Sequence, residues 1–256
     1  MRNRESKKLK EFYEKNYERD SDLFEIPHTN DFMYAQVINQ ILPYLHPGIK
    51  ILDLGCNTGI LSFYMAKKGC EVLGVDLASN AIESAKINKR HHKIENVQFE
   101  SIDFILDWKK EKEFDLILCN QVIEHIPRDD LFLNKIFLSL KEKGDLILFT
   151  PTSYSSLAIL SKKLTGKCYH DEEVGHLRRY NRKGIQDLIK GIGFEINKVV
   201  FLDSALRDWF IIYKPLRRFN TIFSLPIVRN VFNAIDTILA KLFLFPATIC
   251  IHAHKK

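Results

Sequence analysis

A chain of 256 residues with 46% hydrophobic and 27% charged residues has the composition of an ordinary globular protein with a full core. Its formal net charge of +6 reflects 38 basic against 32 acidic residues, an excess too small to indicate a dedicated nucleic-acid binder. The five cysteines show no CxxC pair and no zinc spacing, which favours a reducing, cytoplasmic compartment. The first twelve residues are charged where a signal peptide is apolar, and the longest apolar run, Leu242 to Ile251, is too short to span a bilayer. We therefore expect a large α/β domain that is neither secreted nor membrane-spanning.

Strand-like and helix-like segments alternate along the chain, a pattern that predicts a mostly parallel sheet. Helices are predicted near 5–18 and 30–45, before the sheet begins. Strands are predicted at 49–54, 71–76, 96–100, 114–119 and 144–149, with helices near 59–68, 79–91 and 130–141 between them. We expect these helices to cover both faces of the sheet.

The C-terminal part differs from this alternation. An irregular stretch is predicted at 150–180, followed by a helix near 182–192, a strand at 194–202 and a last strand at 247–254. Because an insertion joins the last two strands, we expect them to form an antiparallel hairpin at the sheet edge. The predicted fold is thus a seven-stranded, mostly parallel α/β sheet with a C-terminal antiparallel hairpin. Residues 1–45 are predicted to form an N-terminal helical cap. The predicted core consists of residues 46–203 and 246–256, and residues 204–245 are predicted to form a helical insertion between these two pieces.

The turn after the first strand, in the segment KILDLGCNTG at 50–59, lies where open α/β sheets bind ligands. A dinucleotide fingerprint needs a second glycine at the position of Asn57, so a diphosphate cofactor is disfavoured. Asp53 would repel a phosphate and suits a cationic amine. Gly55 and Gly59 allow the backbone to approach the ligand, and the helix that starts near Gly59 directs free N–H groups toward a carboxylate.

The ends of the second and third strands supply the features of a nucleoside site. Asp76, with Leu77 beside it, lies 21 residues after Gly55, where an acid binds the two hydroxyls of a ribose. Ile102 and Asp103 offer an apolar wall and a carboxylate for an adenine amino group. The alternative for Asp53, Asp76 and Asp103 is that these carboxylates only cap turns or lie solvated at strand ends. A ligand with an amino acid at one end and adenosine at the other is S-adenosylmethionine.

On these residues the sequence resembles the class I S-adenosylmethionine-dependent methyltransferases over roughly residues 30–200. The family pattern, an acidic residue followed by GxGxG, matches DLGCNTG except at Asn57. The stretch ILDLGCNTGILSFYMAKKGCEVLGVDLASNAIESAK most resembles the ubiquinone-biosynthesis O-methyltransferases and their relatives. The resemblance implies a Rossmann-like fold, S-adenosylmethionine as cofactor, and methylation of a hydroxyl or amine on a small hydrophobic, lipid-linked or sugar-linked acceptor. It also implies that aromatic residues of the N-terminal segment close over the cofactor; they are Phe12, Tyr13 and Tyr17.

The block FDLILCNQVIEHIP resembles the family's loop after strand four, where Asn120 and Gln121 would line the methionine moiety. In the ubiquinone-type enzymes a Glu-x-x-Glu-His cluster there is associated with a divalent metal. Gln121 replaces the first Glu of that cluster, so no metal is predicted. Glu124 and His125 either tie the loop down or act in catalysis. The sequence NQVI lacks the Asn/Asp-Pro-Pro-aromatic pattern used on flipped bases, so we do not expect a nucleic-acid substrate.

Methyl transfer from a sulfonium requires alignment, exclusion of water and, for a hydroxyl acceptor, a base. The histidines His125, His170 and His176 have the appropriate intrinsic pKa; His176 is the predicted base, and His125 is the second candidate. Arg178, Arg179 and Tyr180 are predicted to orient an anionic or phenolic acceptor. The alternative is that Arg178 and Tyr180 only fasten the substrate lid to the sheet.

Residues 204–245 mix aromatic and basic side chains, as interfacial helix pairs do. The segment either contacts a membrane surface, covers the active site or forms a dimer surface. The expected localisation is therefore cytoplasmic, with or without peripheral membrane contact, and the oligomeric state is not indicated. A second functional hypothesis is a noncatalytic module that binds S-adenosylmethionine and acts through protein partners.

Overall fold

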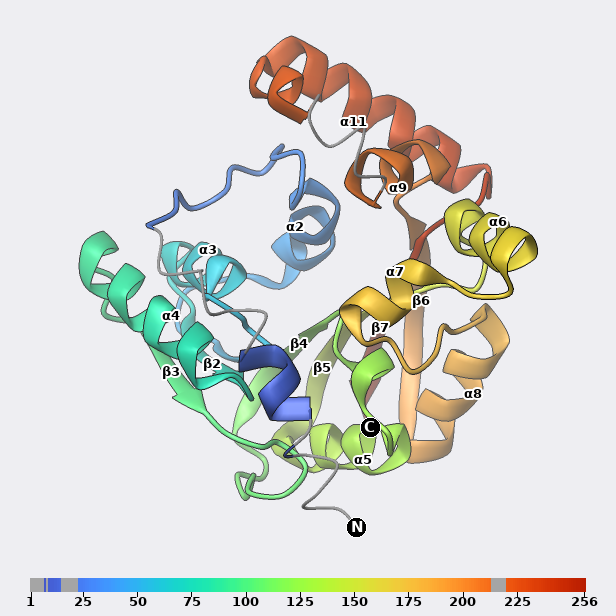
Figure 1. The fold of residues 1–256 in the computed structure, drawn as a ribbon. Helices are drawn as coiled ribbons and strands as arrows, with labels where there is room; N and C mark the ends of the chain where they lie inside the picture. The colour runs from blue at the N-terminus through green and yellow to red at the C-terminus, as the bar shows by residue number, and fades with distance from the viewer. Residues whose placement is uncertain (1–6, 8, 15–22, 213–219) are drawn as a thin grey trace.

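Seven strands form one sheet in the computed structural model, which describes residues 7, 9–14, 23–212 and 220–256 (Figure 1). The strands are β1 Lys50–Leu54, β2 Glu71–Asp76, β3 Val97–Ser101, β4 Phe114–Asn120, β5 Leu140–Pro151, β6 Phe194–Leu202 and β7 Thr248–Lys255. Their order in the sheet is β3-β2-β1-β4-β5-β7-β6. The first five strands are parallel, whereas β7 runs antiparallel to both β5 and β6. The predicted fold class, including the C-terminal antiparallel hairpin, is confirmed.

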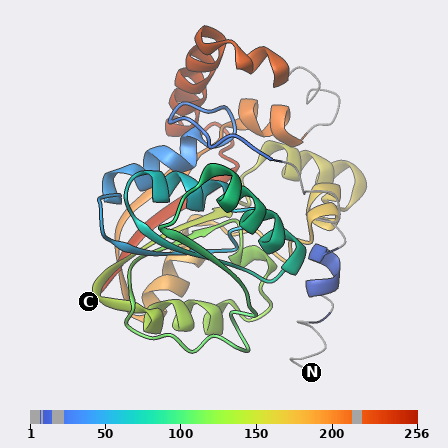
Figure 2. The same ribbon diagram turned by 90° about the vertical axis from the view of Figure 1, so that its left-hand side faces the viewer.

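Helices cover both faces of this sheet (Figures 1 and 2). They are α2 Ala35–Ile41, α3 Ile60–Lys67, α4 Ser79–His92, α5 Asp129–Ser139, α6 Ser156–Thr165, α7 Tyr169–Val174, α8 Arg182–Ile192, α9 Ala205–Ile212 and α11 Pro226–Lys241. Short 3-10 helices are η1 Leu42–Tyr44, η2 Ile123–His125 and η3 Asn220–Ser224.

The core has two layers because successive side chains of a strand point to opposite faces. In β4, Leu116 and Leu118 join the core beneath α2, α3 and α4, whereas Ile117 and Cys119 join the core beneath α5 and α8. All four residues are buried. Such strands, buried on both faces, appear as continuous apolar runs, which explains why their positions can be predicted from the sequence.

The helix predicted at 30–45 was wrong in extent. It begins only at Ala35, because the carboxylate of Asp31 accepts the backbone N–H groups of Met33 and Tyr34 in a turn before it. It ends as η1, which contains Pro43. Of the helix predicted at 5–18, residues 9–14 are helical, and most of the remainder lies outside the described residues.

The stretch predicted to be irregular at 150–180 contains α6 and α7. The hydroxyl of Ser155 accepts the backbone N–H of Ala158 at 3.2 Å and caps the start of α6. Gly166 and Gly175, with φ of 77° and 81°, end the two helices in the left-handed conformation that favours glycine. These caps were present in the sequence, but the weak apolar periodicity between them did not predict helices.

A buried charged network attaches residues 204–245 to the rest of the chain. The Nε atom of Arg207, which is 1% exposed, donates to Oδ2 of Asp236 on α11 at 2.7 Å. Gln36 on α2 donates to the same oxygen at 2.9 Å, and Ser204 donates from its backbone N–H and its hydroxyl to Oδ1. Arg207 also bonds the carbonyl of Phe32. The Asp236 carboxylate therefore holds α9, α11 and α2 together.

Substitution Asp236→Ala is expected to lower the free energy of unfolding by about 3–5 kcal/mol, because it removes the carboxylate that lies 2.7 Å from Nε of the buried Arg207 and leaves only that of Asp203, at 3.4 Å, to balance the charge. The matched control is Asp187→Ala on the exposed side of α8, with an expected change within about 0.5 kcal/mol. Denaturant titration of both variants measures the difference. A loss below about 1 kcal/mol for Asp236→Ala, the range of an exposed ion pair, would contradict the anchoring role.

Candidate functional site

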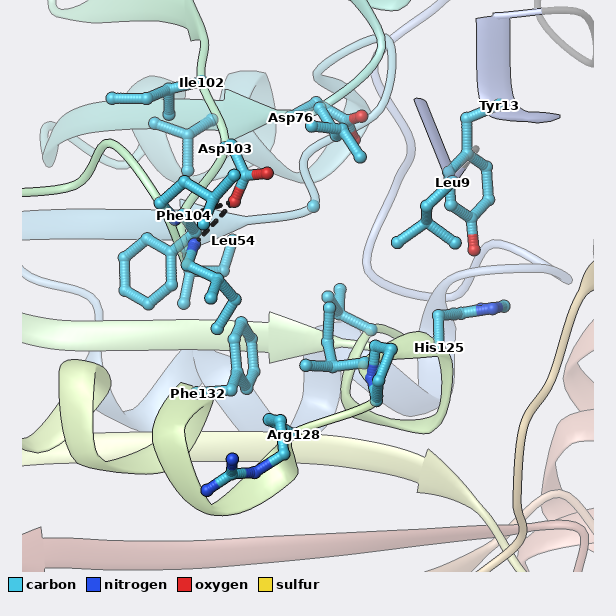
Figure 3. A pocket seen from close by; sticks show the side chains of 18 of the residues that line it. Leu9, Tyr13, Leu54, Asp76, Ile102, Asp103, Phe104, His125, Arg128 and Phe132 are labelled. Atoms are coloured by element: carbon cyan, nitrogen blue, oxygen red, sulfur yellow. Dashed lines mark hydrogen bonds between the residues drawn. The ribbon is translucent and has the colours of Figure 1, made fainter. Parts of the chain in front are cut away.

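A cavity of about 510 Å³ lies beyond the carboxyl ends of β1, β2, β3 and β4 (Figure 3). This is the place where open α/β sheets bind ligands, and the volume falls within the range of small-molecule sites. Of the residues predicted to form the site, those that line the cavity are Gly55, Asp76, Leu77, Ile102, Asp103, Gln121 and His125. Predicted residues that are not part of its wall are Asp53, Asn57, Gly59, Asn120, His176, Arg178, Arg179 and Tyr180.

The turn after β1 requires residues with positive φ. Gly55 has a φ of 69°, and a Cβ atom there would lie 2.3 Å from Cγ2 of Val122 in the loop after β4. Gly59 has a φ of 88°, and a Cβ atom there would lie 2.6 Å from the ring of Phe99. Asn57 also has a positive φ, 52°, and its side-chain oxygen accepts the backbone N–H of Thr58. Asparagine tolerates this conformation better than most residues, which explains the departure from the family glycine.

Asp76 lies at the end of β2 and faces the cavity. Its Oδ2 accepts the backbone N–H of Asn57, and its Oδ1 accepts that of Ala78, both at 2.9 Å. Burial raises the pKa of Asp76 despite these hydrogen bonds. Each carboxylate oxygen has a second lone pair, so the fixed carboxylate can still accept bonds from two ligand hydroxyls.

Asp53 lies behind the glycine turn. It is 2% exposed, and its Oδ2 accepts the hydroxyl of Ser62 on α3 at 2.6 Å. Burial raises the pKa of Asp53 to about 7, while the bond from Ser62 opposes this rise. The carboxylate is therefore separated from the cavity by the turn, and a cation in the cavity would interact with it through this layer.

Asp103 uses its side chain to fold the loop after β3. Its Oδ1 accepts the backbone N–H groups of Ile105 and Leu106 at 2.8 and 2.9 Å (Figure 3). The loop then presents Phe104, whose ring packs edge to face on Phe132 of α5 at 5.5 Å. The sequence analysis missed Phe104, Ile105, Leu106 and Phe132 as cavity residues, although the apolar run directly after Asp103 was the available signal.

Residues 9–14 form a helical turn over one side of the cavity, which Leu9, Phe12 and Tyr13 line. The ring of Tyr13 contacts that of His125 edge to face, with 5.6 Å between the ring centroids. Both side chains are labelled in Figure 3. Glu14 anchors the turn to α4, because its side chain accepts the hydroxyl of Ser79 at 2.7 Å. Tyr17, named with Phe12 and Tyr13 in the sequence analysis, lies outside the described residues.

Glu124, His125 and His176 form a group that we call the Glu-His cluster. The Nε2 atoms of His125 and His176 lie 4.0 and 3.8 Å from Oε1 of Glu124. Burial raises the pKa of Glu124 to about 8 and lowers that of His125 to about 4, so both side chains are neutral at pH 7. His125 lines the cavity, whereas His176 lies behind it. Each member offers one ligand atom, and these atoms lie within 4.8 Å of one another, close enough to hold a metal ion.

The basic and aromatic side chains after His176 bind other groups of the protein. Arg178 and Tyr180 both donate to Oδ2 of Asp129 at the start of α5, at 2.6 and 2.8 Å. Arg179 donates to Asp171 on α7 and to the backbone carbonyl of Thr152, directly after β5. These contacts fasten the segment to α5 and α7, and the roles of Arg178, Arg179 and Tyr180 toward an acceptor stay predictions.

Comparison with known proteins supports the resemblance. Residues 45–200 match the family model described as "Methyltransferase domain". The ubiquinone biosynthesis O-methyltransferase of Bartonella bacilliformis is 30% identical over 172 residues, which are 66% of this chain and 65% of that protein. The chain spans about half the length of other curated relatives that it matches.

Solved structures share the fold at low sequence identity. The [4+2]-cyclase SpnF is 17% identical with a TM-score of 0.65, covering 91% of this chain and 84% of its own. The phosphoethanolamine N-methyltransferase 2 of Haemonchus contortus, solved with S-adenosylhomocysteine, is 19% identical with a TM-score of 0.65, covering 97% of this chain and 60% of its own. The family model matches more than half of the chain, and the chain therefore belongs to the methyltransferase-domain family of S-adenosylmethionine-dependent enzymes.

Proposed function

We propose that this protein transfers the methyl group of S-adenosylmethionine to a hydroxyl of a small hydrophobic acceptor. The observation that carries the proposal is that one cavity joins Asp76 on the cofactor side to His125 on the other side, between mostly apolar walls. Family membership supports the cofactor, and the printed name of the Bartonella relative, an O-methyltransferase, supports a hydroxyl acceptor.

The cofactor would lie along the carboxyl ends of the strands. Asp76 binds the ribose hydroxyls, and Ile102, Phe104 and Asp103 surround the adenine. The methionine end then extends past Gly55 toward Gln121, so its ammonium group lies near the turn that covers Asp53. A cation there favours the ionised form of Asp53, whose pKa burial has raised to about 7.

The acceptor would enter beside the N-terminal turn, where Leu9, Phe12, Ile126 and Leu177 line the cavity. These side chains suit an apolar molecule and exclude water from the reacting atoms. The hydroxyl oxygen attacks the methyl carbon in line with the sulfonium. The new C–O bond forms as the C–S bond breaks, the electron pair stays on sulfur, and the hydroxyl proton must leave.

His125 is placed to accept that proton. A carbonyl oxygen only accepts hydrogen bonds, so the 3.1 Å contact of Nδ1 with the carbonyl of Gly175 makes Nδ1 the protonated nitrogen. The lone pair therefore lies on Nε2, and the low pKa keeps it unprotonated at neutral pH. A noncatalytic module that only binds S-adenosylmethionine would not need an unprotonated histidine nitrogen at this position.

We also propose that a surface formed by α6, α11 and residues 242–245 rests on an anionic membrane. Exposed apolar side chains follow the outer side of α11 at helical spacing, namely Ile227, Val231, Ile235, Ile238 and Leu242. α11 lies at one end of the molecule, and α6, which packs on α9, exposes a second apolar set: Ile159, Leu160 and Leu164 (Figures 1 and 2).

Charge on this surface selects anionic lipid rather than a second copy of the chain. α6 carries the exposed Lys162 and Lys163, and α11 carries the exposed Lys241. Neither helix exposes an acidic side chain, because Asp236 is buried. Two such surfaces would repel each other, whereas anionic headgroups attract them. Among the described residues no helix combines the length and apolarity needed to cross a bilayer.

Substitution Asp76→Ala is expected to weaken binding of S-adenosylmethionine and S-adenosylhomocysteine by about 10- to 100-fold, the worth of hydrogen bonds to a charged group. Isothermal titration calorimetry measures the affinity of each variant for both ligands. The control is Asp107→Ala, which removes an exposed carboxylate outside the cavity. Equal affinity in the folded Asp76→Ala and control variants would place the ribose elsewhere.

Substitution His125→Ala is expected to reduce methyl transfer by at least about 100-fold, the usual contribution of a positioned acid or base. Binding of S-adenosylmethionine should change little, because His125 lies on the acceptor side. The control is His91→Ala on the exposed side of α4. Transfer of a labelled methyl group to an alkyl-chain phenol reports the rate. Wild-type turnover in His125→Ala would exclude this histidine from the reaction.

The membrane proposal predicts that the protein sediments with vesicles containing phosphatidylglycerol and not with pure phosphatidylcholine vesicles. The double variant Ile235→Asp, Ile238→Asp should lose this binding, because it places carboxylates on the outer side of α11. The control is Ile87→Asp, at an exposed position of α4. A wild-type protein that forms dimers in solution and does not sediment with the phosphatidylglycerol vesicles would contradict the proposal.

A further inference from the structure

Two histidine rings direct nitrogen atoms at one buried carboxylate oxygen. Glu124 and His125 belong to η2 after β4, whereas His176 comes from the segment that follows α7. Oε1 of Glu124 lies 4.0 Å from Nε2 of His125 and 3.8 Å from Nε2 of His176. Two segments that are distant in sequence therefore bring three possible ligand atoms within 4.8 Å of one another.

Both rings are oriented through their other nitrogen. Nδ1 of His125 donates to the carbonyl oxygen of Gly175 at 3.1 Å, and Nδ1 of His176 lies 2.9 Å from Oδ1 of Asp171. Asp171 is in turn held by Arg179 through bonds of 2.9 and 3.0 Å. A carbonyl and a carboxylate are the groups that usually orient metal-binding histidines, because they fix the tautomer that presents Nε2.

Glu124 supplies an independent indication of a ligand. Its side chain is fully buried, and Oε2 accepts the hydroxyl of Thr150 at 3.1 Å. Oε1, the oxygen that faces the two histidines, accepts no hydrogen bond from any described residue. A buried polar atom without a hydrogen-bond partner lowers the stability of the folded protein, and such atoms in native proteins often contact a bound water or ion.

We propose that the Glu-His cluster binds a divalent transition-metal ion, with Zn²⁺ as the representative. Two imidazoles and one carboxylate form the ligand set of open zinc sites, in which a fourth position remains for a small molecule. Tetrahedral ligands at about 2.0–2.2 Å from the ion lie roughly 3.3–3.6 Å apart. The two separations from Oε1 of Glu124, 4.0 and 3.8 Å, would need to shrink by less than about 1 Å, and the two histidine nitrogens, which lie within 4.8 Å of each other, would approach through small rotations of their rings.

The ligand types also set the metal preference. The Glu-x-x-Glu-His cluster of the resembling enzymes is carboxylate-rich, but Gln121 removes one carboxylate in this chain. His176 adds a nitrogen from a different segment. Because Mg²⁺ prefers oxygen ligands and imidazole suits Zn²⁺ and its neighbours, the cluster favours a transition metal over Mg²⁺.

A bound ion would join the two segments that flank the acceptor side of the cavity. Gly175 and Leu177, on either side of His176, line the cavity, as does His125. When bound, such an ion supplies Lewis-acid polarisation of an oxygen in its open position. The role of His125 as proton acceptor therefore applies to the metal-free protein, because a metal-bound Nε2 has no free lone pair. This inference deepens the proposed function, but metal binding itself does not depend on which acceptor is used.

The test is metal retention by the tag-free, chelator-treated full chain after dialysis against buffered Zn²⁺. We expect about one Zn²⁺ per chain and a thermal midpoint that rises with free Zn²⁺, as mass action requires. His176→Ala should weaken Zn²⁺ binding by at least about 100-fold, because it removes a ligand. Asp171→Asn should weaken it by about 10- to 100-fold, because it removes the carboxylate that orients His176. The control is His170→Ala, whose ring lies 5.8 Å from His176 but outside the cluster.

Calorimetry with S-adenosylmethionine accompanies each variant, so failure of the cofactor site and failure of the metal site are distinguishable. Variants that still bind the cofactor but lose Zn²⁺ in the order given support the proposal. A folded wild type that retains no Zn²⁺, or a His176→Ala variant that retains it as tightly as His170→Ala, would overturn it. Equal stabilisation by Mg²⁺ and Zn²⁺ would overturn the metal preference.

Discussion

The contact between Gly55 and Val122 determines how the two halves of the site meet. No side chain larger than hydrogen fits at Gly55, because Cγ2 of Val122 occupies the place of a Cβ atom. The turn after β1 therefore lies directly against the loop after β4. Since β1 and β4 are neighbours in the sheet, this contact places Asp76 and His125 around one cavity. The two sides of the cavity that are proposed for the cofactor and the acceptor depend on this close packing.

Buried acids give the site its electrostatic character. Burial raises the pKa of Asp53 to about 7 and that of Glu124 to about 8, so neither carboxylate is fully ionised in the empty protein at neutral pH. Each lies close to a place where a cation is proposed, the ammonium group of the cofactor for Asp53 and a metal ion for Glu124. A cation favours the ionised carboxylate and thereby recovers part of the cost of burial. Acids with perturbed pKa values are typical of functional sites, and both lie directly behind residues that line the cavity, Gly55 and His125.

The sheet and the cofactor side were predictable from the sequence for physical reasons. Parallel strands are buried on both faces, so their apolar runs mark them, and the acids at their ends mark the ligand side. The helices α6 and α7 were missed because glycine and serine caps define them better than apolar periodicity does. The proximity of His176 to Glu124 depends on the path of the chain after β5, which local sequence does not encode. The roles of Arg178 and Tyr180 depended on Asp129, a partner about 50 residues away that only the fold brings near.

The buried network around Asp236 separates the chemistry from the outer surface. It fixes α9 and α11 to α2, so the apolar side of α11 faces outward while the cavity stays at the strand ends. The proposed reaction is methyl transfer to a hydroxyl of a hydrophobic molecule. The most direct measurement supplies the protein with methyl-labelled S-adenosylmethionine and either an alkyl-chain catechol or the same compound with its hydroxyls blocked. Label is expected in the organic extract of the free catechol only, in a form that survives alkaline hydrolysis as a methyl ether does. Binding of S-adenosylmethionine with no extractable label, or label on the blocked compound, would contradict it.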